Sequence, residues 1–91
     1  MRTRDIMKFI DKAHEKHNEF MGVCDVIAAE AKKHIQYTDE ISCDFYPGDG
    51  ICICVDGIDA IPHVVPASTF FRHAKLKEGA LSDDEIRLMS I

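Results

Sequence analysis

The sequence predicts an α+β domain in which one long N-terminal helix packs on a small antiparallel sheet of two or three strands, followed by two short C-terminal helices. Three observations support this prediction. An apolar period of three to four residues runs through the first third of the chain. Two apolar, β-rich stretches with a turn between them follow, and a proline and a capping box mark the starts of two later helices. A length of 91 residues is that of one domain, residues 1–91.

The N-terminal helix is predicted over residues 3–36, with Thr3 as its cap. Such a helix is about 50 Å long, whereas a domain of this size is nearer ~30 Å across. Either the helix breaks between Asn18 and Gly22, or its free end pairs with another subunit. We favour one continuous helix and a homodimer. The apolar side chains expected in the dimer interface are Ile6, Ile10, Ala13 and Phe20.

A hairpin is predicted from two strands, residues 41–46 and 51–55, around the turn residues Pro47 to Gly50. A two-residue loop at Gly48 and Asp49 would pair Phe45 with Cys52 and Cys43 with Cys54. The face expected to receive the long helix then consists of Ile41, Cys43, Phe45, Cys52 and Cys54. Residues 58–61 are predicted as a possible third, edge strand that Pro62 ends.

Two short helices are predicted over residues 67–77 and 83–90. Pro66 suits the start of the first, and Ser82 and Glu85 form a capping box at the start of the second. We expect these helices to cover the second face of the sheet.

The charge distribution carries the main functional prediction. The net charge is −5, and no Lys or Arg occurs between His34 and Phe71. An acidic surface of this kind can dock on a basic surface of another protein, with electrostatically steered association. We therefore expect a small protein-binding module, an inhibitor or immunity-type protein of the kind carried by phages or other mobile elements. Its partner-binding residues are predicted to be Asp39, Glu40, Asp44, Asp49, Asp56 and Asp59.

Two alternatives remain open. The first is a small nucleic-acid-binding regulator that uses a basic stripe on the N-terminal helix, formed by Arg2, Arg4, Lys8, Lys12 and Lys16. The second is a small metal- or cysteine-dependent enzyme. The four cysteines, Cys24, Cys43, Cys52 and Cys54, have no CxxC spacing, so we expect core thiols rather than zinc ligands. A Cys43–Cys54 disulfide is a further hypothesis that rests on the predicted register alone.

No catalytic residue, metal or cofactor is predicted, because the sequence contains no phosphate loop, nucleophile elbow or dinucleotide fingerprint. No stretch approaches the ~20 apolar residues of a membrane span. The N-terminus leads into an amphipathic pattern rather than an apolar signal core, so the expected location is the cytoplasm.

Overall fold

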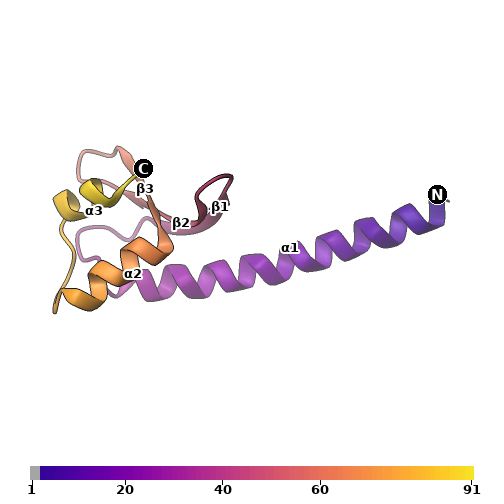
Figure 1. Cartoon of the computed structure of the whole chain (residues 1–91), viewed down its shortest axis with the longest axis horizontal. Helices are drawn as coiled ribbons and strands as arrows, with labels where there is room; N and C mark the ends of the chain where they lie inside the picture. The colour runs from indigo at the N-terminus through magenta and orange to yellow at the C-terminus, as the bar shows by residue number, and fades with distance from the viewer. Residues whose placement is uncertain (1–2) are drawn as a thin grey trace.

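The computed structural model describes residues 3–91 and confirms the predicted α+β class (Figure 1). A long N-terminal helix precedes a three-stranded antiparallel sheet, and two short helices follow. The bounds are α1 Thr3–Lys32, β1 Ile41–Tyr46, β2 Gly50–Asp56, β3 Pro62–Pro66, α2 Ala67–Leu76 and α3 Asp83–Met89. Arg2 and the side chain of Thr3, with its predicted cap, lie outside the described part of the chain.

Helix α1 is continuous through Gly22 and projects far beyond the sheet (Figure 1). It contains 30 residues, and the molecule measures 54 × 21 × 20 Å. Only the C-terminal part of α1 packs on the rest of the chain, where Cys24 and Ala31 are buried. The helix ends four residues earlier than predicted. The N–H groups that follow Lys32 bond to carbonyls three residues back, which tightens the chain and turns Ile35 into the core.

The hairpin register differs by one residue from the predicted one. Cys43 pairs with Ile53 and Phe45 with Ile51, because residues 47–49 form a three-residue loop and Gly50 already belongs to β2. Gly50 has a φ of +79°, a conformation that glycine adopts without strain. A shift of one residue exchanges the two faces of a strand. The prediction that Cys52 and Cys54 face the long helix is therefore wrong. The isoleucines on either side of Cys52 face the helices instead.

The predicted edge strand at residues 58–61 is also wrong. Those residues form the turn between β2 and β3, in which the Ala60 N–H donates to the Gly57 carbonyl at 2.9 Å. The third strand is Pro62–Pro66, paired antiparallel with β2. It begins and ends with a proline, which an edge strand tolerates because the missing N–H is not needed by a neighbouring strand.

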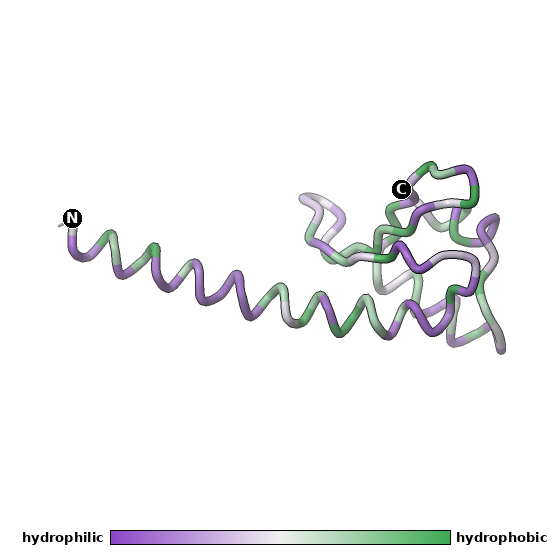
Figure 2. The backbone as a smooth tube through the Cα atoms, turned by 180° about the vertical axis from the view of Figure 1, so that it is seen from behind, coloured by the Kyte–Doolittle hydropathy of each residue, from purple (hydrophilic) through white to green (hydrophobic). Residues whose placement is uncertain are grey.

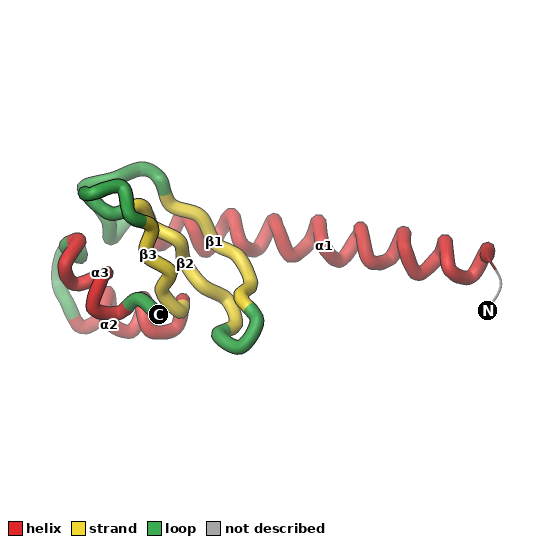
Figure 3. Tube along the Cα trace, turned by 90° about the horizontal axis from the view of Figure 1, so that it is seen from above, coloured by secondary structure: helices red, strands yellow, loops and turns green. Residues whose placement is uncertain are grey.

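The core lies on one side of the sheet only. Its sheet members, Ile53, Val55 and Val65, share one face, and residues of all three helical regions pack on them. The helical side contributes Ala31, Ile35, Phe70, Ala74, Leu81 and Ile86. Our expectation that the C-terminal helices cover the second face is wrong, since the strands lie in front of both α1 and α2 in Figure 3. The opposite sheet face is left without a helix.

Candidate functional site

The uncovered face of the sheet, called the open face below, is the candidate site. Alternation along the strands decides its membership, because neighbouring side chains point to opposite faces. The side chains that alternate with the core positions belong to Ser42, Asp44, Tyr46, Cys52, Cys54, Asp56, Pro62, Val64 and Pro66. No Lys or Arg is among them, so the fixed charges of this face are all negative.

Three of the six predicted partner-binding carboxylates lie on the open face. The Asp56 N–H donates to the Glu40 carbonyl at 3.2 Å, so these two residues lie side by side where β1 begins and β2 ends. Glu40 continues the alternation of β1 and falls on the same face as Ser42. Asp44 lies further along β1, opposite Cys52. All three carboxylates are exposed, and none of them lies within ion-pair distance of a cationic group in the described chain.

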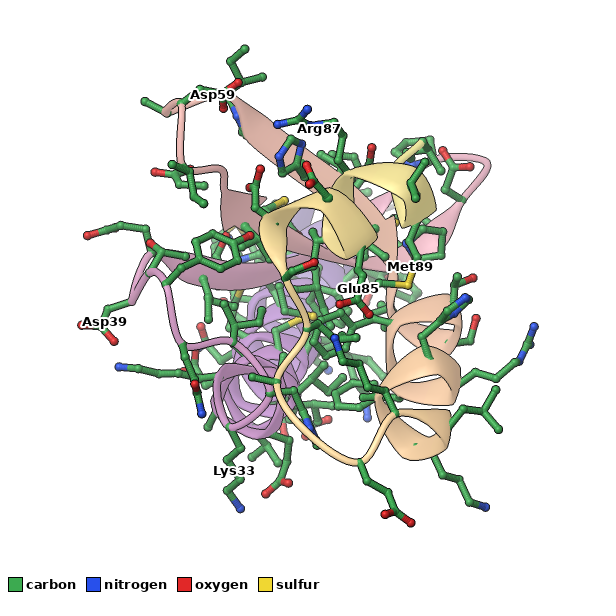
Figure 4. All side chains as sticks on the ribbon, turned by 90° about the vertical axis from the view of Figure 1, so that its left-hand side faces the viewer. Lys33, Asp39, Asp59, Glu85, Arg87 and Met89 are labelled. Atoms are coloured by element: carbon green, nitrogen blue, oxygen red, sulfur yellow. The ribbon has the colours of Figure 1, made fainter. Side chains whose placement is uncertain are left out.

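The other three predicted residues lie elsewhere. Asp39 pairs with Lys32 at 3.3 Å, and Asp59 lies 4.0 Å from Arg87 (Figure 4). Asp49 is exposed in the hairpin turn, beyond the end of the open face. Three of the six predicted carboxylates therefore share one surface, and the other three do not.

The centre of the open face is apolar. The Tyr46 hydroxyl and the Cys54 sulfur are 2.7 Å apart, although Tyr46 is paired with Gly50, four residues before Cys54. The phenol ring therefore extends along β2 over Cys52, which is fully buried. The hydrogen bond to Cys54 raises the pKa of Tyr46 to about 12. Half-buried Val64 continues this apolar strip onto β3.

The cysteines show no arrangement for nucleophilic chemistry. Burial, with a hydrogen bond to Cys24, raises the pKa of Cys43 to about 12, and burial also raises the pKa of Cys52. A nucleophilic thiol needs a lowered pKa. Cys43 and Cys54 lie on opposite faces of the sheet, so the hypothesised disulfide between them is wrong. Within residues 3–91, no group of three or more His, Cys, Asp or Glu side chains could hold a metal ion.

A buried histidine–aspartate pair is the feature that the sequence did not reveal. His63 on β3 and Asp83 on α3 are each only 6% exposed, and the His63 Nε2 lies 3.3 Å from the Asp83 carboxylate. The two groups do not form a hydrogen bond, because their geometry is unsuitable. Asp83 instead accepts hydrogen bonds from the Ile58 N–H at 3.2 Å and from the Arg87 Nη2 at 3.0 Å. Burial alone would raise the pKa of Asp83, but these donors outweigh it and lower the pKa. Nearby Tyr37 is half-buried, and burial raises its pKa to about 12, with a smaller effect of Asp83.

The pair connects three segments of the chain. It joins β3, α3 and the turn at Ile58. Gly57 packs so closely here that an added Cβ would lie 2.6 Å from the His63 Nε2. Within the sequence, His63 lies in a short apolar stretch and Asp83 in a capping box, 20 residues apart. Only the fold brings them together, so no spacing rule could have found the pair.

The basic stripe proposed for nucleic acid lies on the projecting part of α1. Arg4, Lys8, Lys12 and Lys16 are exposed there, but four acidic residues are interleaved with them over residues 4–19. Lys16 forms an ion pair with Glu19 at 3.5 Å. The segment has no net charge, so it lacks the positive potential that phosphate backbones require.

No protein-family model, curated protein or solved structure matches this chain. Among the described residues, no helix is both long enough and apolar enough to cross a membrane; α1 has the length but carries charges throughout. The site must therefore be interpreted from its own geometry.

Proposed function

We propose that this chain is a small acidic protein-binding module that acts by occupying a basic surface of a partner protein with its open face. One observation supports this above the others. The single sheet face that no helix covers carries three exposed carboxylates, Glu40, Asp44 and Asp56, around an apolar centre and contains no Lys or Arg.

The composition of the open face fits protein recognition. Protein interfaces combine an apolar, well-packed centre with a polar rim. Here Tyr46 and Val64 supply the apolar centre, and the carboxylates surround it. Because the charges are exposed and of one sign, they speed association with a basic surface and make it sensitive to salt.

The proposed biological role is that of an inhibitor or immunity-type protein, such as phages and mobile elements carry. Its small size and mild acidity support this class. We further propose that the module is a homodimer joined through the projecting part of α1, where Ile6 and Ile10 are exposed.

The test is affinity capture from a lysate of the native host with two variants that carry the same change in charge. The face variant removes three charges from the open face with the substitutions Glu40→Gln, Asp44→Asn and Asp56→Asn. The control variant removes three exposed charges elsewhere, with the substitutions Asp25→Asn, Glu78→Gln and Asp84→Asn. Amides keep the size and hydrogen-bonding oxygen of each side chain, so both variants should fold.

We expect a basic protein to be captured by the native chain and by the control variant, but not by the face variant. Its capture should also weaken strongly between about 50 and 500 mM salt, where the Debye length falls from ~14 to ~4 Å. Equal capture by the face variant and the native chain would refute the proposed role of the open face.

A further inference from the structure

The projecting part of α1, residues 4–20, is an apolar helix face without a cover, and it is called the free half below. Within it, the stripe residues Ile6 and Ile10 are 43% and 40% exposed, and Phe9 beside them is 61% exposed. Figure 2 shows hydrophobic segments recurring along this half of the helix. Exposure of several large apolar side chains in one continuous stripe indicates an interaction surface.

The stripe has the spacing of a coiled coil. Its residues follow each other at alternating intervals of four and three positions, which is the heptad pattern of two packed helices. The members are Ile6, Ile10, Ala13, His17, Phe20, Cys24, Ile27 and Ala31. The second half of the same stripe is already used within the chain, because Cys24 and Ala31 are buried under the sheet. The free half is therefore the continuation of a packed seam.

The charge of the free half points to a second copy of this chain as its occupant. Residues 4–20 contain four basic and four acidic side chains, so the net charge of −5 lies elsewhere in the chain. A neutral helix is not repelled by its own copy, and it offers neither a basic surface for a polyanion nor an acidic surface for a basic partner.

The position of the sheet determines the direction of pairing. The sheet sits on the same stripe that would face the second helix, next to Cys24 and beyond. In a parallel pair, the two sheets would lie at the same height along the paired helices and would clash with each other. In an antiparallel pair, they lie at opposite ends, which also separates the two acidic bodies.

The apolar surface continues from the helix onto the hairpin. Phe45 is 56% exposed although it lies on the helix-facing side of β1, two residues from buried Cys43. Cys43 on β1 and Cys24 on α1 are both buried where the helix packs on this strand, so the surface of the stripe and the underside of the hairpin are contiguous. An antiparallel helix that follows the free half of α1 ends at this place.

We infer that two copies pair antiparallel along the free halves of α1, and that the N-terminal end of each helix seats against Phe45 of the other copy. The inference rests on the proposed homodimer and adds its direction and its second contact. It also leaves the open face of each sheet free, because that face points away from α1.

Sedimentation equilibrium of the full chain tests the stripe. The native chain should have twice the mass of one chain at about 100 µM. The variant Ile6→Gln with Ile10→Gln should raise the dimer Kd at least about 100-fold, since it removes two apolar layers. The control variant Lys8→Gln with Glu15→Gln changes the outer side of the same helix and should leave the Kd unchanged. A monomeric native chain, or equal effects of both variants, would overturn the dimer.

Photocrosslinking tests the direction, with p-benzoylphenylalanine in place of Met7, which lies beside the stripe and is half-exposed. Mixed ¹⁵N-labelled and unlabelled chains identify crosslinks between copies. An antiparallel pair should crosslink this position to residues 14–26 or to the hairpin of the other copy. Crosslinks to residues 1–11 of the other copy would overturn the antiparallel direction while leaving the homodimer intact.

Phe45→Gln tests the hairpin contact. It should raise the dimer Kd about tenfold, whereas Ile58→Gln, at a more exposed position of the sheet's other end, should not. An unchanged Kd for Phe45→Gln would overturn the seating of the helix end. The open-face variant should remain dimeric, so loss of partner capture and loss of dimerisation report on separate proposals.

Discussion

A pair of glycine-to-alanine substitutions provides the sharpest test of the fold. At Gly57, a Cβ would lie 2.6 Å from the His63 Nε2, 2.8 Å from the Ile61 carbonyl oxygen and 2.9 Å from the Asp59 carboxylate. The Ile61 carbonyl belongs to the backbone and the His63 ring is buried, so neither of these two neighbours can move away freely. At Gly22, in the middle of α1, nothing lies within 4 Å of the added Cβ. The same chemical change should therefore have opposite effects at the two sites.

The expected magnitudes follow from packing and from helix propensity. Overpacking a tight site costs about 1–3 kcal/mol, so Gly57→Ala should lower the free energy of unfolding by that amount. Gly22→Ala should raise it by about 0.5–1 kcal/mol, because alanine favours the helix. For a domain of this size, about 1 kcal/mol corresponds to ~4–8 °C in Tm.

Urea denaturation followed by circular dichroism measures both changes. All proteins should be compared at one concentration, since association contributes to apparent stability. Gly22 lies on the outer side of α1, away from the stripe, so dimerisation does not mask its effect. A Gly57→Ala variant within about 0.5 kcal/mol of the native chain would refute the close packing around His63. A destabilised Gly22→Ala variant would refute the continuous helix.

Three further predictions concern the body of the molecule. Ser82→Ala should cost about 1 kcal/mol in thermal melts, because the Ser82 hydroxyl accepts the Glu85 N–H at 3.2 Å, whereas Glu85→Gln should retain most of the capping box. Ile53→Ala should cost about 2–5 kcal/mol in urea denaturation because it opens a cavity in the core, whereas Ile58→Ala at an exposed turn should stay within about 0.5 kcal/mol. Because the pKa of Asp83 is lower in the folded protein than its ordinary value of 3.8, the ionised carboxylate stabilises the fold at pH values above 3.8. This stabilisation is lost as the pH falls through the folded pKa. The Tm of Asp83→Asn should therefore be lower than that of the native chain at pH 6 and should fall less between pH 6 and pH 3; parallel pH profiles would contradict this.

The elements that depend on local pattern were predictable from the sequence. The period of α1 is long and regular enough to indicate a helix, and its conflict with the domain diameter correctly indicated a projecting end. The capping box at Ser82 located α3 to within one residue. These features depend on residues within a few positions of each other, so no knowledge of the fold is needed to find them.

The register and the third strand were not predictable in this way. A hairpin loop of two residues and one of three residues both suit Pro47-Gly48-Asp49-Gly50, and the choice between them depends on how β2 packs. Strand β3 was not predicted because it begins and ends with a proline. A proline in a strand is compatible only with an edge position, and the sequence does not show which strand lies at the edge of the sheet. His63 lies on that same strand, so the His63–Asp83 pair could not be predicted either.

The one-residue difference in register also determines what kind of surface the open face is. If the predicted register were combined with the observed one-sided arrangement of the helices, the open face would carry Ile51, Ile53 and Val55, a large exposed apolar patch that favours aggregation. In the observed register, Ile53 and Val55 lie in the core, and the open face carries two cysteines beside the Tyr46 ring. A moderately apolar centre with a carboxylate rim suits reversible binding better than a continuous aliphatic patch. The three-residue hairpin loop thereby separates two roles. The strongly apolar surfaces serve folding and the proposed helix seam, and the charged sheet face is the surface that we propose for a partner of opposite charge.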